Sequence, residues 1–156
     1  IQQTMVHHNN LYFKLYVSGF EVFKEYKFFG VGNKNYRVVT CNNDKLKIEQ
    51  NKKYHCLTHP HQVYLEFFSE HGVFGSFIIF FILYKLIFSK IKKTLMGTNY
   101  IHIGSFIYLI LIFLPLLPSG SFFSDYSMTV FAINISIFYA SNKEINVFSG
   151  KKSVIS

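Results

Sequence analysis

The sequence has no tryptophan, few acidic residues and few cysteines, and these scarcities limit the classes of function that the chain can have. Only two of the 156 residues are cysteine and only eight are Asp or Glu. Arginine occurs once, as Arg37. The lysines behind the formal net charge of +8 are scattered among apolar segments instead of forming a basic patch, which argues against nucleic acid as a partner. No internal repeat or low-complexity linker interrupts the chain.

Apolar and aromatic residues are what the chain has in excess. Half of its residues are hydrophobic, with 19 Phe and 11 Tyr, which is unusual for a soluble globular domain. Three apolar runs, at residues 73–89, 101–117 and 128–139, follow one another in the second half. The first is about as long as a bilayer is thick. The sequence therefore predicts an all-α fold, a polytopic membrane helical bundle preceded by an extramembranous helical loop.

The positions of the lysines orient these predicted spans. Residues 90–93 (KIKK) hold three lysines, whereas the turn at residues 119–127 holds none. The positive-inside rule then places the KIKK turn and the C-terminal lysines in the cytoplasm. Residues 1–72 lie outside, in the periplasm of a Gram-negative cell. Residues 73–156 form three transmembrane helices with short loops and a cytoplasmic tail.

The outer part begins with an amphipathic pattern and a glycine turn. We expect a helix of about three turns at residues 18–26, lying on the membrane surface or against a missing partner. Gly30 and Gly32 form a G-x-G turn, but no Rossmann-type strand and helix surround it, so we reject nucleotide binding and expect no cofactor. Lys34 and Arg37 follow, and the planar guanidinium suits bidentate phosphate binding. The alternative is that Arg37 is an ordinary solvated residue.

The two cysteines, Cys41 and Cys56, both lie in the outer part and flank a polar loop at residues 42–55. In an oxidising compartment they could pair, closing a loop of about 15 residues worth about 3 kcal/mol in the chain-entropy model. The alternative is two free thiols in a reducing compartment. The predicted outside location favours the disulfide.

A helix is predicted to start at Pro60, because proline is tolerated at the first helical position, with Thr58 or His59 as its cap. Residues spaced by four and three then form two stripes along this helix. The polar stripe holds Gln62, Glu66 and Glu70, and the neighbouring stripe holds His61, Tyr64, Leu65 and Phe68. Gly72 and Gly75 mark the passage into the first apolar run.

The H-P-H sequence of His59 and His61 allows three interpretations. With Glu66 or Glu70 the histidines could supply three metal ligands, but no further ligand cluster is evident, so we predict no metal site. They could also be interface histidines that form only local hydrogen bonds. The third interpretation is acid–base chemistry, since histidine titrates near neutrality and a carboxylate or lipid phosphate sets its charge. We favour this third one, with Arg37 nearby in space.

Three segments together resemble a known family. THPHQVYLEFFSEHGVFG is similar to the H-x-H-N-x-Y-L-x-x-x-x-E-x-G-x-x-G signature of the bacterial O-antigen ligase and O-antigen polymerase superfamily. FKEYKFFGVGNKNYR and PLLPSGSFFSDY resemble the segments that precede the signature and introduce the last span in that superfamily. The resemblance covers the C-terminal portion of such proteins. We therefore expect this chain, which begins with Ile1, to be a fragment that lacks the N-terminal transmembrane helices.

The resemblance implies a multi-pass glycosyltransferase of the bacterial inner membrane. Its donor is a glycan on undecaprenyl diphosphate and its acceptor is another glycan or lipid A-core. By resemblance, His61 is the general base or positioner of the acceptor hydroxyl, with His59 a weaker candidate. Lys34 and Arg37 become candidates for diphosphate contact. Glu70 orients His61 or caps the span rather than reacting.

The remaining motif positions are supporting residues, namely Gln62, Tyr64, Gly72 and Gly75. One of them departs from the signature, because Gln62 stands where asparagine is usual, which lengthens the side chain's reach. The sequence does not separate polymerase from ligase. A different class of function also stays open: a non-catalytic membrane interaction subunit or truncated remnant. As a fragment, the chain is expected to be inactive alone.

Overall fold

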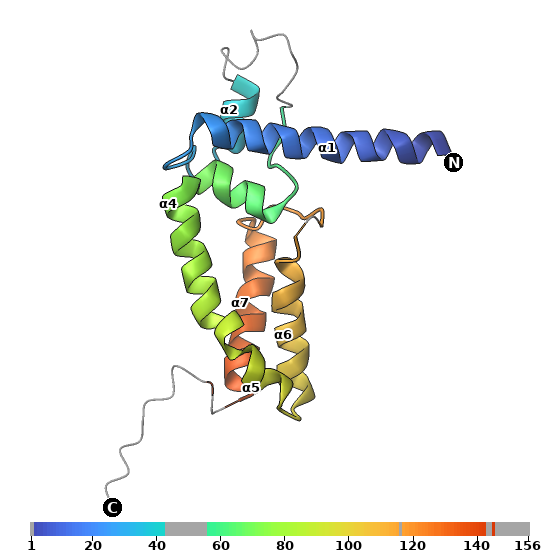
Figure 1. The fold of residues 1–156 in the computed structure, drawn as a ribbon. Coiled ribbons are helices and arrows are strands. Elements are labelled where there is room, and N and C mark those ends of the chain that lie inside the picture. Colours follow the sequence, from blue (N-terminus) through green and yellow to red (C-terminus); the bar gives the residue numbers. More distant parts are fainter. Residues whose placement is uncertain (1, 43–55, 116, 143–144, 146–156) are drawn as a thin grey trace, which may run out of the picture.

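The computed structural model describes residues 2–42, 56–115, 117–142 and 145, and these residues form helices joined by turns and loops (Figure 1). The helices are α1 (Gln2–Glu25), α2 (Tyr36–Asn42), α4 (Val63–Leu86), the short 3-10 helix η1 (Phe88–Lys90), α5 (Ile91–Leu95), α6 (Tyr100–Ile112) and α7 (Asp125–Ala140). No strand occurs within these described ranges. The predicted all-α class is therefore confirmed.

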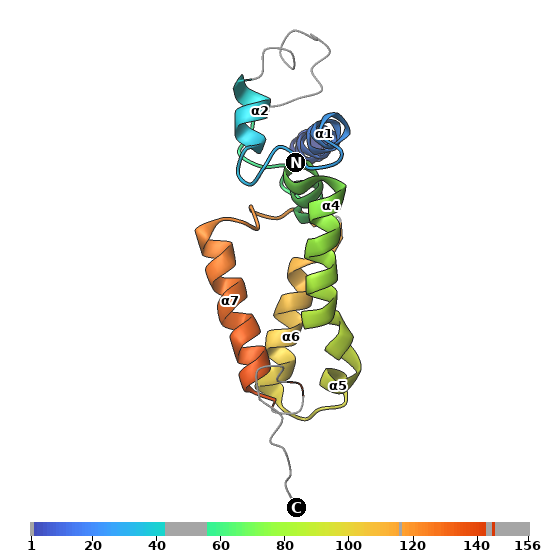
Figure 2. The same ribbon diagram turned by 90° about the vertical axis from the view of Figure 1, so that its left-hand side faces the viewer.

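The helices form a bundle with a cap across one end. Helices α6 and α7 pack side by side, the lower part of α4 runs roughly along their axes, and α1 lies across the upper end of α4 (Figure 1). Figure 2 shows α2 beside α1 at that same end. Phe106 of α6 and Phe138 of α7 stack with ring centroids 5.6 Å apart, and Leu83 and Ile87 are buried in the same cluster. The apolar runs therefore pack on one another at the lower end, away from the cap.

The structure corrects the bounds of the first helix. Expected at residues 18–26, it runs from Gln2 to Glu25. No proline or glycine occurs from Gln2 to Ser18 to end the helix earlier. The predicted amphipathic face is present in the second half of α1. Leu15 and Val22 are buried there, and the Phe23 ring lies 5.2 Å from the Phe68 ring of α4.

The start of the helix after the histidines was also predicted wrongly. It begins at Val63 and not at Pro60, with Gln62 as its N-cap: the side chain of Gln62 accepts a hydrogen bond from Leu65 N at 2.7 Å. His61 has φ 55°, a left-handed conformation that cannot continue a helix. The two histidines therefore lie on a turn before the helix.

The segment predicted as a lysine-rich turn is helical, with η1 and α5 covering residues 88–95. A buried histidine explains why α5 is held against the bundle. His102 Nε2 contacts Thr94 Oγ1 of α5 at 3.1 Å, and His102 Nδ1 contacts the carbonyl of Phe138 at 2.9 Å. One imidazole thus joins α5, α6 and α7.

The second and third apolar runs have different ends from those predicted. Helix α6 stops at Ile112, five residues short of residue 117, because Leu114 precedes Pro115 and a residue before proline avoids helical geometry. Helix α7 starts at Asp125, three residues before Met128, because Ser124 caps it by accepting from Ser127 N at 3.2 Å.

Helix α4 is bent sharply at Gly72, which has φ 62° and ψ −167°. The first turns of α4 lie beneath α1, and the helix then turns downward into the bundle (Figure 1). At the bend, two donors and two acceptors of the helix bond residues 27–32 instead of each other. The bonds are Val73 N to Lys27 O (2.8 Å), Phe74 N to Phe28 O (3.3 Å), Val31 N to Ser69 O (3.0 Å) and Gly32 N to Glu70 O (2.8 Å).

We call residues 27–32 and 69–74 the kink clamp. These four bonds pair helix groups that the bend would otherwise leave without partners. The two chain segments approach so closely that only glycine fits. A Cβ on Gly30 would lie 2.3 Å from the Glu70 carbonyl, and one on Gly72 would lie 2.4 Å from the Phe28 carbonyl.

One helical stretch of the described residues, Val63–Leu95, is long and apolar enough to cross a membrane, and α6 is apolar but shorter. Because the kink separates the arm at residues 63–71 from the rest of α4, we take the spanning part to begin after Gly72. The bundle of three spans stays a prediction.

Candidate functional site

The two histidines of the H-P-H sequence lie together on the turn before α4. The His59 and His61 ring centroids are 4.0 Å apart, and His59 Nδ1 contacts Thr58 Oγ1 at 2.9 Å. Pro60 between them is fully buried. It packs against Gly19 of α1 so closely that a Cβ on Gly19 would lie 2.7 Å from the proline Cβ. Helix α1 thus fixes the turn that presents the histidines.

The loop after α6 forms the other wall of the site. Ser119 N donates a hydrogen bond to the carbonyl of His61 at 2.9 Å. His59 Nε2 and Ser119 Oγ are both buried and have no hydrogen-bond partner in the described structure. Buried polar atoms are almost always paired, so these two atoms are available to bond water or a ligand.

Both imidazoles are held in the neutral form. Burial lowers the pKa of His59, and an interaction with the backbone of Ser119 partly opposes the shift. Burial also lowers the pKa of His61, which nearby His59 lowers further and Glu66 raises in part. A neutral imidazole at pH 7 has a free nitrogen lone pair, so either ring can accept a proton from a hydroxyl.

Glu66 is the carboxylate that acts on His61. It is only 1% exposed and accepts hydrogen bonds from Ser121 Oγ and, at 2.8 Å, from Phe122 N. Burial raises the pKa of the Glu66 carboxyl, while these hydrogen bonds and His61 oppose the rise. Glu66 therefore ties the 119–124 loop to α4 beside the histidines.

Glu70 belongs to a different part of the site from the one expected. Its carboxylate accepts a hydrogen bond from the backbone N of Lys34 at 2.9 Å and holds the Gly30–Tyr36 turn. No contact in the described structure joins it to His61, and it lies at the kink rather than at a helix end. Burial raises the pKa of Glu70 to about 7, partly opposed by the Lys34 N–H and increased by Glu66.

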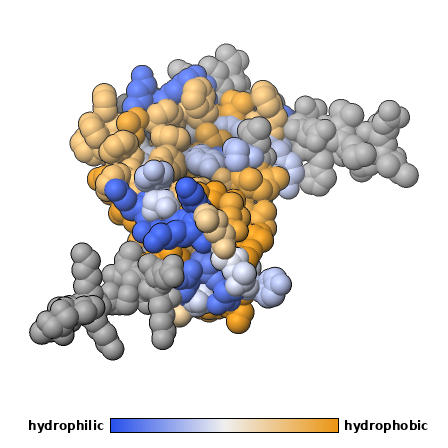
Figure 3. All heavy atoms as spheres, turned by 60° about the horizontal axis from the view of Figure 1, so that its bottom comes forward, coloured by the Kyte–Doolittle hydropathy of each residue, from blue (hydrophilic) through white to orange (hydrophobic). Residues whose placement is uncertain are grey.

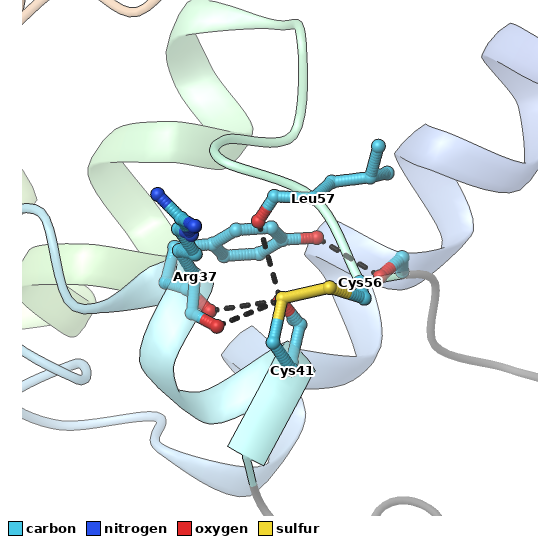
Figure 4. The surroundings of a disulfide bond; sticks show 7 residues. Arg37, Cys41, Cys56 and Leu57 are labelled. Carbon is cyan, nitrogen blue, oxygen red and sulfur yellow. Dashed lines mark hydrogen bonds between the residues drawn. A yellow bond between two sulfur atoms is a disulfide. The ribbon is translucent and has the colours of Figure 1, made fainter.

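The two candidate phosphate-binding cations lie on and after this turn. Lys34 has φ 60°, and its Nζ lies 3.3 Å from Asp125 Oδ1 at the start of α7. This ion pair is exposed, so it adds little stability and is easily exchanged for another anion. Arg37 is exposed on α2, and its guanidinium points away from the neighbouring disulfide (Figure 4).

Helix α2 is fastened at both ends. Tyr36 is fully buried and donates a hydrogen bond to Ser18 Oγ of α1 at 2.9 Å. Cys41 forms a disulfide with Cys56, with Cα atoms 4.5 Å apart. Thr40 Oγ1 donates to the carbonyl of Leu57 beside it at 3.3 Å (Figure 4). Arg37 and the histidine turn are therefore joined by a short covalent path. The polar loop between the cysteines lies, apart from residue 42, outside the described residues.

The supporting motif residues have structural roles. Gln62 caps α4, and the hydroxyl of Tyr64 donates to the carbonyl of Phe113, which joins α4 to the end of α6. Gly72 forms the bend. Gly75 gives room to His71, because a Cβ there would lie 2.6 Å from the His71 Cβ.

Three residues of the loop after α6 belong to the site but were not predicted from the sequence. They are Ser119 and the two partners of Glu66, Ser121 and Phe122. The signal was available, since serines cluster at 119–127 between two apolar runs. In the described part of the chain, no group of three or more His, Cys, Asp or Glu side chains gathers to hold a metal ion. The arrangement offers two neutral bases, exposed cations and buried unpaired polar atoms.

Comparison with known proteins finds a similarity within the first half of the chain. Residues 6–80 match the family model described as O-antigen ligase. No curated protein and no solved structure matches the chain. The matched segment contains the histidine turn, the kink clamp and α2, whereas the PLLPSGSFFSDY segment lies beyond it. The resemblance to the O-antigen ligase and polymerase superfamily is thereby confirmed.

Proposed function

From the match of residues 6–80 to the O-antigen ligase family, we propose that this chain is the C-terminal portion of a membrane glycosyltransferase. Its donor is a glycan on undecaprenyl diphosphate, and its acceptor is a second glycan or lipid A-core. The observation that carries the proposal is the His59–His61 pair, which lies within the family-matched residues and is held beside the unpaired hydroxyl of Ser119 from the loop after α6.

The transfer needs one base and one cationic site. The acceptor hydroxyl gives its proton to a nitrogen of His61 while its oxygen forms a bond to the anomeric carbon of the donor. The bond between that carbon and the diphosphate breaks, and the diphosphate leaves with the bonding electrons. Lys34 and Arg37 stabilise the negative charge of the leaving diphosphate, with Lys34 exchanging its exposed contact to Asp125.

The membrane placement follows from where apolar side chains are exposed. Past the kink, α4 exposes large hydrophobic side chains, among them Phe77, Ile78 and Phe81. Figure 3 turns the lower end of the bundle forward and shows hydrophilic side chains in its middle with hydrophobic surface on both sides. We place this end, with Lys90, Lys92 and Lys93, in the cytoplasm of a bacterial inner membrane.

The cap and the site then lie outside. Residues 1–72 are periplasmic, and residues 73–156 supply three transmembrane helices that contact lipid and the N-terminal spans of the same protein. Contact with lipid and with those spans would cover the exposed aromatic surface, whose exposure to water is unfavourable. The fragment by itself lacks those spans, and we expect it to be inactive.

The test uses the full-length protein in cells that make the polysaccharide. His61→Ala should abolish the ladder of long surface polysaccharide, and His61→Gln should do the same because an amide cannot act as a base. Asn33→Ala, which truncates an exposed residue of the Gly30–Tyr36 turn, is the control and should leave the ladder intact. A normal ladder in both His61 variants, at wild-type protein level, would refute the role of His61.

The cations have their own matched comparison. Lys34→Ala and Arg37→Ala should each lower polysaccharide yield, whereas Lys27→Ala, which removes an exposed cation on the other side of the glycine turn, should not. Equal yields from all three variants would remove the diphosphate site from the proposal. The acceptor found in the product distinguishes the two activities. A polymerase yields longer lipid-linked chains, whereas a ligase yields glycan attached to lipid A-core.

A further inference from the structure

A cavity of about 460 Å³ opens at the lower end of the bundle, away from the histidine turn (Figure 1). Its wall contains residues from the end of α5, the start of α6 and the end of α7, namely Lys93, Met96, Thr98, Asn99, His102 and Asn142. The volume lies in the range of small-molecule sites. The proposed glycosyl transfer takes place at the other end of the molecule, so this cavity has no part in it.

Hydrogen bonds between the helices hold the wall of the cavity in place. His102 is only 1% exposed, and it joins the oxygen atoms of Thr94 and Phe138: its Nε2 lies 3.1 Å from Thr94 Oγ1, and its Nδ1 lies 2.9 Å from the Phe138 carbonyl. The side chain of Asn99 donates to the carbonyl of Ser141 at 2.9 Å. Carbonyls at a helix end are otherwise free acceptors. Because these two at the end of α7 are paired, they do not oppose an anion in the cavity.

Lys93 gives the wall a positive charge. Its side chain is exposed and forms no ion pair within the part of the chain that the structure describes. Lys90 and Lys92 are close to it in the chain, and residues 73–124 contain no Asp or Glu. This end of the bundle therefore attracts anions.

Large apolar side chains lie beside the cavity. Met96 is 75% exposed and Tyr100 is 88% exposed, and their neighbours Leu95 and Ile101 are exposed as well. Figure 3 shows hydrophilic side chains in the middle of this end and hydrophobic surface on both sides. A soluble anion makes no use of such a surface, whereas the hydrocarbon chains of a lipid cover it. The surroundings therefore suit a ligand that has both an anionic group and acyl chains.

We propose that this cavity binds the headgroup of an anionic phospholipid from the surrounding leaflet. The ammonium of Lys93 bonds the phosphate, the hydroxyl of Thr98 bonds the glycerol part of the headgroup, and the acyl chains lie along Met96 and Tyr100. Basic pockets between membrane helices are known to take acidic headgroups in this way. The inference goes beyond the proposed transfer and needs only the proposed placement of this end at a membrane surface.

The test measures lipid binding directly. Full-length protein in detergent is mixed with equal amounts of phosphatidylglycerol and phosphatidylcholine that have the same acyl chains, and the bound lipids are counted by native mass spectrometry. We expect phosphatidylglycerol to be retained over phosphatidylcholine, and an excess of inorganic phosphate not to displace it. Equal retention of both lipids would overturn the proposal. Displacement by inorganic phosphate would overturn it too, because the ligand would then be a free anion.

Matched variants distinguish a built site from a diffusely basic surface. Lys93→Ala should weaken phosphatidylglycerol binding about tenfold, the size expected for a hydrogen bond between charged groups. Lys92→Ala, which removes the same charge from the same helix outside the wall, should weaken it much less. Thr98→Trp keeps the charge and fills the cavity from an exposed loop position, so it should also weaken binding. Equal losses from Lys93→Ala and Lys92→Ala, or undiminished binding in Thr98→Trp, would contradict the proposal.

The outcome is separable from the proposed chemistry. His61→Ala should retain phosphatidylglycerol like the wild type while losing the polysaccharide ladder, because the two sites lie at opposite ends of the molecule. Loss of the lipid in His61→Ala would contradict a separate site. If the lipid results are as expected but His61→Ala keeps a full ladder, the headgroup site stands and the assigned chemistry fails.

Discussion

Substituting Gly72 by alanine should destabilise the bend in α4 that positions the candidate site. Gly72 has φ 62° and ψ −167°, a conformation that only glycine adopts readily. An added Cβ would also lie 2.4 Å from the carbonyl of Phe28, which is a backbone atom held in the kink clamp. Neither problem is relieved by rotating a side chain, so the backbone itself must shift.

The magnitude follows from the clamp. Forcing alanine into this conformation costs about 1–3 kcal/mol. Moving residues 27–32 away weakens the four clamp hydrogen bonds, each worth about 1 kcal/mol net. If half of that bonding is lost, the total is about 3–5 kcal/mol. For a chain of this length, the melting temperature falls by on the order of 10 °C.

The assay is thermal unfolding of the purified protein in detergent, followed by circular dichroism. Gly104→Ala is the matched control, because Gly104 lies in α6 with nothing within 4 Å of an added Cβ. Alanine there should raise helix stability by up to about 1 kcal/mol. Equal melting temperatures for Gly72→Ala and Gly104→Ala would refute the clamp as the origin of the bend.

Three further predictions concern the buried acid, the disulfide and the bundle core. The carboxyl of Glu70 has a pKa of about 7 in the fold against 4.5 in the unfolded chain, so the folded state binds more protons between these pH values. The free energy of unfolding therefore falls as pH rises through this window. Glu70→Gln should flatten that pH dependence in unfolding curves measured at pH 4.5–7. Cys41→Ser should cost about 3 kcal/mol, and both native cysteines should resist maleimide labelling until reduced. Phe138→Ala should cost about 3–5 kcal/mol in the same thermal assay, and Ile133→Ala, exposed on the same helix, less than about 1 kcal/mol.

Each of these has a contradicting result. A pH dependence unchanged in Glu70→Gln would mean that another group titrates in the window. Ready labelling of both native cysteines in the unreduced protein would contradict the disulfide. Equal losses from Phe138→Ala and Ile133→Ala would show that the stacked rings of α6 and α7 do not form the core of the bundle.

Much of the fold was predictable because apolar runs and glycines act locally. The all-α class follows from the apolar periodicity, and the turn at Gly30 and Gly32 follows from glycine's freedom at positive φ. The kink at Gly72 was foreseen only as a boundary. The bend is held by hydrogen bonds to residues 27–32, which lie some 40 residues earlier in the chain. The pattern of residues around Gly72 carries no information about that pairing.

The sequence allowed the residue types of the candidate site to be predicted, but not most of the contacts between those residues. The H-P-H sequence indicated titratable chemistry, but the helix start depended on Gln62 as a cap and on the left-handed conformation of His61. The acid beside His61 differs from the one expected, which was Glu70. Glu66 acts on His61 and bonds the loop after α6, while Glu70, one turn later, bonds the backbone N of Lys34.

The central claim is that His61 removes the acceptor's proton during transfer from a lipid diphosphate. Its most direct test is the release of undecaprenyl diphosphate from a lipid-linked donor by the purified full-length protein, measured with and without His61 across pH 5–8. Wild-type turnover should fall as pH drops below neutrality and an imidazole with a lowered pKa becomes protonated. His61→Ala should lose about 100-fold or more at all pH values. A His61→Ala rate equal to the wild type, with the same pH profile, would contradict the account.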